Sequence, residues 1–161
     1  MIQIKCMVLP ILFLLSSCST PVQEPIHTPS SSFGEDLLSA INELRVSGCQ
    51  CGNTYMSAVD PLTWDLRLES AAEMHAKDMH TNDFFDHKGS DGSQVWDRVG
   101  EAGFDWMAVA ENIAWGHDSI EEVVQSWKKS SGHCKTLMSP EYSFTGAAKV
   151  GTYWVQTFAD Q

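Results

Sequence analysis

The hydrophobic period changes near the end of the chain, and this change most constrains the fold. Residues 143–149 and 152–158 are β-rich, and the pair at 150–151 between them is typical of a hairpin turn. Earlier, apolar residues recur at helical spacing, most clearly over residues 64–82. Helices first and strands late, without βαβ alternation, predict an α+β domain with a small antiparallel sheet between helices.

The remaining elements follow from the same periodicity and from capping residues. His75 lies on the apolar face of the helix over 64–82, where a lone histidine is more often a satisfied core residue than a ligand. We also expect most of the six tryptophans to be core residues. The other expected elements are a helix over about 35–46, a loop over 48–61, a short helix from Ser93 to near Gly103, an extended segment over 107–113, a helix from Ser119, and a helical turn over 132–138.

Length and charge limit the classes of function. The chain has 161 residues, which favours one domain with a real core. Ten basic against 21 acidic residues give a formal net charge of −11. Nucleic-acid binding depends on Lys and Arg that neutralise phosphates, so the composition argues against it. It also argues against a polybasic membrane patch, and the acidity itself names no partner.

The N-terminus has the features of an export signal. The apolar run Met7–Leu15 is too short to span a bilayer but suits a signal peptide over residues 1–17. The sequence Leu-Ser-Ser-Cys that ends at Cys18 resembles a bacterial lipobox, which would make Cys18 a lipidated first residue. An ordinary signal peptide with an incidental cysteine is the alternative. Residues 18–33, rich in Ser, Thr and Pro, read as a flexible tether.

This reading predicts an exported protein held in the cell envelope by a lipid anchor only, or at the cell surface. Ser19 follows Cys18 where an aspartate usually directs retention in the inner membrane. The absence of an aspartate at position 19 favours the outer membrane, if the bacterium has one.

The folded part retains three cysteines, Cys49, Cys51 and Cys134. An exported protein can hold a disulfide, and three cysteines allow one bridge and one spare thiol. A bridge between Cys49 and Cys51 would be strained, which favours Cys134 as one end. A zinc site made from all three is the alternative, although one Cys-x-Cys with a distant third cysteine is a weak zinc pattern.

Three residues are the main candidates for chemistry. His87 follows the aromatic pair Phe84-Phe85 and precedes a turn-rich run, which suggests an imidazole at the lip of a cavity. Glu111 and His133 lie in two later stretches that would supply partners. Two neutral imidazoles and one carboxylate would make a first shell for a divalent cation. Without a metal, the same trio would act as acid and base or would only hold loops together.

Six short stretches, taken in order, resemble the CAP superfamily, the cysteine-rich secretory protein, antigen 5 and pathogenesis-related group, in its short bacterial form. The resemblance implies an α-β-α sandwich and a CAP domain over residues 34–161. The stretches are Pro61-Leu-Thr-Trp64, Phe84-Phe-Asp-His-Lys-Gly-Ser-Asp-Gly92, Ala110-Glu-Asn-Ile-Ala114, Val123-Val-Gln-Ser-Trp127, Ser130-Ser-Gly-His-Cys134 and Trp154-Val-Gln-Thr-Phe158.

The family cavity is lined by two histidines and two glutamates, and this chain matches three of them. His87, Glu111 and His133 correspond to the first histidine, one glutamate and the second histidine. Ser130 stands where the second glutamate is expected, and Glu122 points away from the apolar helix face. The resemblance also implies a disulfide between Cys51 and Cys134, which would leave Cys49 spare.

The leading hypothesis is therefore a binding module with a cleft around His87, Glu111, His133 and Ser130. Its ligand would be a small molecule, a lipid, a peptide, or an envelope or host protein. The alternative is a metal-dependent, peptidase-like hydrolase, with His87 and His133 as ligands of zinc or calcium and Glu111 as ligand or base. Neither a Gly-x-Ser-x-Gly nor a His-Glu-x-x-His motif is present, so whether the chain is an enzyme is left open. No other cofactor is expected.

Overall fold

The computed structural model describes residues 28–161. The predicted signal peptide and Cys18 lie outside the described residues. No helix within 28–161 is long and apolar enough to cross a bilayer. The elements in chain order are α1 (Ser32–Ser47), β1 (Cys49–Cys51), β2 (Thr54–Met56), β3 (Thr63–Trp64), α2 (Leu66–Asn82), α3 (Val95–Glu101), β4 (Ala108–Trp115), α4 (Ile120–Lys129), α5 (Ser131–Leu137), β5 (Phe144–Val150) and β6 (Tyr153–Asp160).

The predicted C-terminal hairpin forms the centre of the main sheet, whose strand order is β3-β5-β6-β4. Strands β5, β6 and β4 pair antiparallel, as predicted, with Glu111 opposite Thr157. The two-residue strand β3 adds to β5 in parallel, so the sheet is mixed rather than purely antiparallel. Strand β4 is consequently an edge strand of the sheet.

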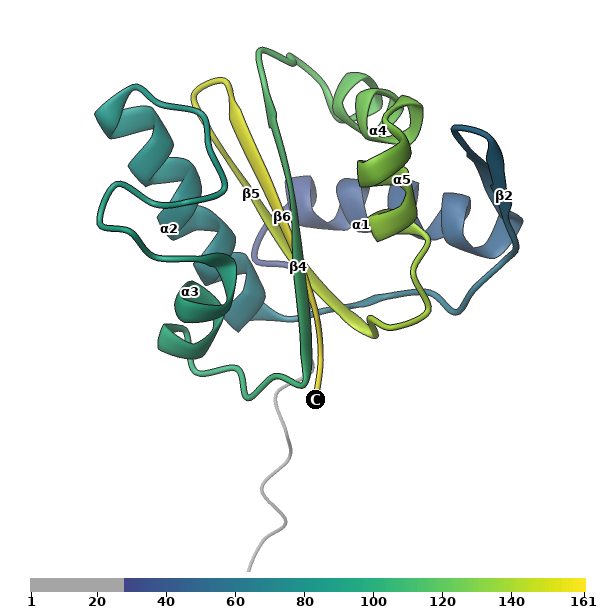
Figure 1. Cartoon of the computed structure of the whole chain (residues 1–161), viewed down its shortest axis with the longest axis horizontal. Helices are drawn as coiled ribbons and strands as arrows, with labels where there is room; N and C mark the ends of the chain where they lie inside the picture. The colour runs from purple at the N-terminus through teal and green to yellow at the C-terminus, as the bar shows by residue number, and fades with distance from the viewer. Residues whose placement is uncertain (1–27) are drawn as a thin grey trace, which may run out of the picture.

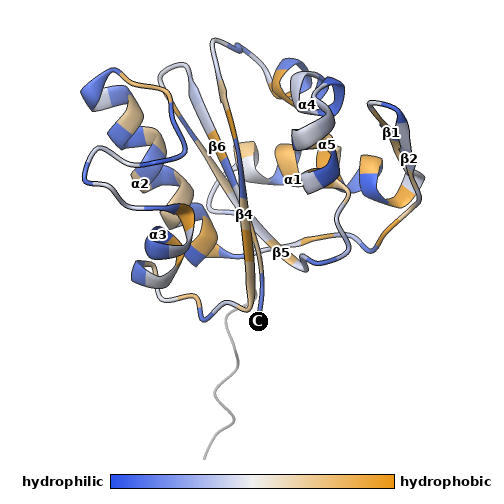
Figure 2. Ribbon diagram, in the orientation of Figure 1, coloured by the Kyte–Doolittle hydropathy of each residue, from blue (hydrophilic) through white to orange (hydrophobic). Residues whose placement is uncertain are grey.

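Helices cover both faces of this sheet (Figure 1). Helix α2 packs on β5 and β6, with α3 beside it, while α1, α4 and α5 lie on the opposite face. This arrangement is the α-β-α sandwich predicted from the sequence. Figure 2 shows α2 with hydrophilic outer turns and a more hydrophobic side toward the sheet, as expected for an amphipathic covering helix.

The core has a different composition on each face of the sheet. The face under α1 and α4 contains Trp64, Trp127, Trp154 and Phe158, each at most 2% exposed. The face under α2 is lined with small residues of that helix, among them Ala72 and Ala76. Small side chains let α2 lie close to the strands, whereas large aromatic residues fill the opposite face.

Helix α2 and the sheet approach each other closely at Gly146 in β5, which lies beneath the first turn of α2. A Cβ at this position would be 2.1 Å from the backbone nitrogen of Glu69 and 2.4 Å from the carbonyl carbon of Leu68. Both neighbours are backbone atoms, which cannot move without shifting the helix. The absence of a side chain at Gly146 therefore sets the distance between α2 and the sheet.

The segment 48–61, expected to be a loop, contains a short antiparallel hairpin. Strands β1 and β2 pair with Cys49 opposite Met56 and Cys51 opposite Thr54. Three-residue strands are too short to give a period-2 pattern in the sequence, so the prediction missed them. The hairpin carries two cysteines to the side of α5 that bears Cys134.

The first helix also begins slightly earlier than expected. Helix α1 starts at Ser32 rather than Glu35, and Phe33 packs 5.8 Å from the ring of Trp154. The Ser30 hydroxyl donates a hydrogen bond to Glu69. Ser30 and Phe33, at the end of the predicted tether, therefore contact the folded domain.

Candidate functional site

Glu111 is the centre of the main polar cluster. Its Oε1 accepts a hydrogen bond from Nδ1 of His87 at 2.8 Å, and its Oε2 accepts one from Nη2 of Arg98 at 2.9 Å. The side chains of Glu111 and Arg98 are only 2% and 4% exposed, whereas that of His87 is 54% exposed. We call His75, His87, Arg98, Glu111 and His133 the histidine site.

The position of Glu111 follows from the alternation of strand β4. Ile113, two residues further on, packs in the cluster under α2, so Glu111 points to the same face, toward α2 and α3. Because β4 is the edge strand, this carboxylate lies at the margin of the sheet, where a loop can reach it. That loop is the Phe84–Gly92 segment, which the sequence identified as the family motif.

The loop leaves α2 through a left-handed residue. Asp83 caps the helix with φ 52°, and its backbone N–H donates to the carbonyl of Met79. The backbone of the loop is then held from two sides. Nε2 of His75 donates to the carbonyl of Asp86 at 2.8 Å, and Nη2 of Arg98 donates to the carbonyl of His87 at 3.1 Å. His87 is thus fixed through its backbone, and its outer ring edge is left to solvent.

His75 is fully buried, as expected for a core histidine, but it also belongs to the site. Its Nε2 lies 3.9 Å from Oε1 of Glu111. Its Nδ1 is buried without a hydrogen-bond partner in the described part of the chain. The sequence does not reveal this role, because the partners, Asp86 and Glu111, lie on other segments of the chain.

Arg98 is the residue that the sequence analysis missed entirely. It lies on the buried face of α3 beside Val99, is 3% exposed, and donates to Glu111 and to the carbonyl of Ser93. A short helix does not reveal by period alone that a cation faces inward. The buried Glu111 was the available signal, because a buried carboxylate needs a positive or hydrogen-bonding partner.

His133 approaches from the opposite face of the sheet. It lies on α5, where its carbonyl accepts from Nδ2 of Asn112 at 3.2 Å, and Asn112 alternates with Glu111 along β4. Ser130 is the residue between α4 and α5, and its carbonyl accepts from the amide of Cys134. The structure therefore brings His87 and Glu111 into hydrogen-bond contact, and His133 is near enough for the charge of His87 to act on it.

The three histidines of the site differ in electrostatics. The hydrogen bond to Glu111 raises the pKa of His87 above the ordinary histidine value. Burial lowers the pKa of His75, and burial together with the nearby charge of His87 lowers the pKa of His133. At neutral pH, His87 is the histidine of the site most easily protonated, and His75 and His133 favour the neutral form.

This geometry fits a metal poorly. Within residues 28–161, one group of three His, Cys, Asp or Glu brings its donor atoms within 4.8 Å of one another, and it is the cysteine group, not the histidine site. Both oxygens of Glu111 are engaged, and Arg98 already supplies a positive charge. Calcium prefers oxygen ligands, which imidazoles do not offer. We therefore derive no metal chemistry at this site.

The tryptophans divide evenly, contrary to the expectation that most are core residues. Trp64, Trp127 and Trp154 are buried, whereas Trp96, Trp106 and Trp115 are 47%, 41% and 61% exposed. Trp106 precedes β4 and Trp115 ends it, so they lie at opposite ends of the strand that carries Glu111.

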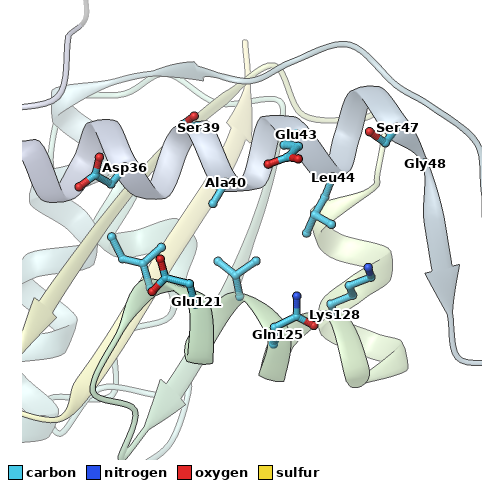
Figure 3. Close-up of a pocket in the computed structure, with 12 residues that line it drawn as sticks. Asp36, Ser39, Ala40, Glu43, Leu44, Ser47, Gly48, Glu121, Gln125 and Lys128 are labelled. Atoms are coloured by element: carbon cyan, nitrogen blue, oxygen red, sulfur yellow. The ribbon is translucent and has the colours of Figure 1, made fainter.

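A groove of about 870 Å³ lies elsewhere, between α1 and α4 (Figure 3). Leu44 and Val124 contribute apolar surface to it. Its rim is mostly acidic, with Asp36, Glu43 and Glu121 opposed by Lys128. It contains no residue of the histidine site, so this hollow and the titratable cluster are separate.

The cysteines pair as the family resemblance implied. Cys51 and Cys134 form a disulfide, with a sequence separation of 83 residues, which joins the β1–β2 hairpin to α5. Cys49 is left as a free, buried thiol. The bridge fixes α5, and with it His133, relative to the hairpin.

Comparison with known proteins agrees with this description. Residues 38–158 match the CAP family, described as the cysteine-rich secretory protein family, so the chain belongs to it. Among curated proteins it is 33% identical over 100 residues to the uncharacterized protein YkwD of Bacillus subtilis, and 31% identical over 97 residues to the uncharacterized membrane protein YlbC of the same species. These matches cover 61% and 60% of this chain, but only 39% and 28% of the relatives.

Solved structures show the same fold at low sequence identity. An extracellular protein with an SCP domain from Bacillus anthracis superposes with a TM-score of 0.71 at 24% identity, covering 81% of this chain and 41% of that one. An outer surface protein of Borrelia burgdorferi gives 0.68 at 23% identity, covering 79% and 91%. The CAP fold therefore occurs both as a nearly whole protein and as part of a longer one.

Proposed function

We propose that this CAP protein is an exported, lipid-anchored binding module that holds an envelope ligand at His87. The observation that carries the proposal is the double engagement of Glu111 by His87 and Arg98. The two structural neighbours described as extracellular and outer surface proteins support an exported location, as does the lipobox-like sequence before Cys18.

The engagement of Glu111 favours binding over catalysis. A general base must accept a proton from the reacting group, and a metal ligand must offer a free lone pair toward the metal. Here one oxygen accepts a hydrogen bond from His87 and the other accepts one from the buried guanidinium of Arg98, so both oxygens already have partners. The alternative, a metal-dependent hydrolase, lacks a free acid at Ser130 as well.

The chemistry of the exposed ring edge indicates what the ligand offers. Nδ1 of His87 is occupied by Glu111, so Nε2 is the ring nitrogen that remains for a ligand. Protonated His87 presents an N–H donor with a positive charge there, and charge-assisted hydrogen bonds of this kind form with anionic groups, carboxylates among them. We infer a ligand with a carboxylate, carried by a peptide or a lipid of the envelope.

The test uses a matched pair of probes on the mature protein. An acetylated peptide with a free C-terminal carboxylate is titrated by ¹H–¹⁵N NMR, beside the same peptide with an amidated C-terminus. We expect chemical-shift changes around His87 and Glu111 with the first peptide only, and their loss in His87→Ala. Binding should be stronger at about pH 6 than at about pH 8, on either side of the ordinary histidine pKa of about 6.5.

Two results would contradict the proposal. One is equal binding of the two peptides, or binding that survives His87→Ala. The other is peptide hydrolysis that is abolished by a chelator and by Glu111→Gln, which would restore the hydrolase alternative.

A lipid ligand is tested with vesicles that contain a free fatty acid, and vesicles that contain the fatty-acid methyl ester are the matched control.

A further inference from the structure

A second group of reactive side chains lies where the β1–β2 hairpin meets α5. The Sγ atom of Cys49 is 3.6 Å from that of Cys134 and 3.9 Å from that of Cys51. Cys51 and Cys134 are fully buried, and Cys49 is 6% exposed. The binding proposed at His87 does not involve this free thiol.

The surroundings of the three sulfurs are apolar and rich in sulfur. Met138 is fully buried in the same cluster, and Leu44, Met56 and Val59 pack against it. Thiolates and thioethers are the donors that soft cations prefer. A buried group of this composition suits a soft cation better than magnesium or calcium, which require oxygen ligands.

The position of Cys49 does not suit thiol–disulfide exchange. In exchange, a thiolate attacks one sulfur of the bridge along the line of the sulfur–sulfur bond. Cys49 is nearly equidistant from the two bridged sulfurs, so it lies beside the bond and not behind either end. The three sulfur atoms lie at the corners of a compact triangle, so all three can bind one metal ion placed among them once the bridge is open.

The dimensions of the triangle agree with this interpretation. Sulfur ligands at about 2.3 Å from a zinc ion in tetrahedral geometry lie about 3.8 Å from one another. Two of the three edges, at 3.6 and 3.9 Å, already have this length while the bridge is intact. Only the edge between Cys51 and Cys134 must lengthen when the bridge is opened.

We propose that Cys49, Cys51 and Cys134 form a redox-gated site for a soft d¹⁰ cation, Cu⁺ or Zn²⁺. A dithiol reductant transfers two electrons and two protons to the bridge, which becomes two thiols while the reductant becomes a disulfide. The three thiols then lose three protons and bind one cation through three thiolates. Reoxidation by a disulfide oxidant transfers two electrons from the Cys51 and Cys134 thiolates to that oxidant, which becomes a dithiol. The Cys51–Cys134 bond re-forms, Cys49 regains a proton, and the cation is released.

The experiment uses the mature protein, reduced without oxygen by a phosphine that is then removed. Cu⁺ and Zn²⁺ are each titrated in competition with a chromophoric chelator, and the oxidised protein is titrated in parallel. We expect one equivalent of cation per reduced chain and none per oxidised chain. The relative affinities for Cu⁺ and Zn²⁺ show which cation the site prefers, and binding of either cation to the reduced chain supports the proposed site.

Cys49→Ser is the informative variant because it keeps the disulfide and removes one ligand. Loss of even an outer partner of a metal ligand costs 10–100-fold in affinity, so loss of a ligand should cost at least about 100-fold. A reduced native protein that binds neither cation would overturn the proposal, as would reduced Cys49→Ser that binds as tightly as the native chain.

Two controls separate this site from unfolding of the reduced chain and from the histidine site. If the reduced chain unfolds, the cation should raise its melting temperature in the native sequence but not in Cys49→Ser, because only a folded site gains from binding. His87→Ala should bind the cation normally. Failure of the cysteine site would thus leave the proposal for His87 untouched, and the reverse also holds.

Discussion

At the scale of single residues, the structure shows that Glu111, predicted as a candidate base, accepts hydrogen bonds from both His87 and Arg98. The sequence predicted that His87 and Glu111 share a site, and they are hydrogen-bonded at 2.8 Å. It did not reveal Arg98 or the participation of His75, because their partners lie on other elements. Local periodicity reports which face of a helix is apolar, but not which buried charge lies opposite that face.

Glu111→Gln should destabilise the protein strongly. The substitution removes the charge that compensates buried Arg98, and breaking such a pair costs about 3–5 kcal/mol. The matched control is Glu73→Gln, which removes one member of an exposed pair with Lys77 and should cost at most about 0.5 kcal/mol. Urea denaturation of the three proteins measures both. Equal stability of Glu111→Gln and the native chain would show that the Arg98 pair is not as buried as described.

At the scale of elements, the sequence predicted the long helices and the C-terminal hairpin, because each has enough residues to show its period. Helix α4 begins after Ser119 and buries Val123, Val124 and Trp127, as the spacing indicated. The strands of two or three residues, β1 to β3, were not predicted. They are defined by their pairing partners rather than by their own pattern, and β3 forms only because β5 is beside it.

Gly146→Ala tests how close α2 lies to the sheet. The new methyl group would overlap the backbone of Leu68 and Glu69, so α2 must shift, at a cost of about 1–3 kcal/mol or more. Gly100→Ala is the control. It lies in α3, where the new Cβ would meet no atom within 4 Å apart from its chain neighbours and the adjacent backbone of its own helix, and should stabilise the protein by up to about 1 kcal/mol. Thermal unfolding compares them, and a neutral Gly146→Ala would contradict the packing described.

At the scale of the whole molecule, the family and the fold agree, and the anchor is a prediction from the N-terminal sequence. The resemblance recognised in six short stretches is confirmed by the CAP match over residues 38–158. Physical patterns alone led to an α+β domain but not to this family. The family was recognised from the order of the six motifs, because each motif alone is too common to identify it.

Cys18→Ala should release the protein from membranes. Without the cysteine no lipid can be attached, and the described domain has no helix that could cross a bilayer. Cys6→Ala, which changes a cysteine within the predicted signal peptide, is the control and should remain membrane-bound. Fractionation of expressing cells followed by immunoblotting measures the distribution. Retention of Cys18→Ala in the membrane fraction would mean that the lipobox interpretation is wrong.

The central claim is that Glu111, held by Arg98, keeps His87 as the protonated, ligand-facing residue. Histidine ring NMR across a pH titration measures this directly. We predict that His87 titrates above the ordinary value of about 6.5 and above His133, and that Glu111→Gln lowers the pKa of His87. Carboxylate binding should then be lost as pH rises through the pKa of His87. A His87 that titrates at or below the pKa of His133, or that is unaffected by Glu111→Gln, would contradict the account.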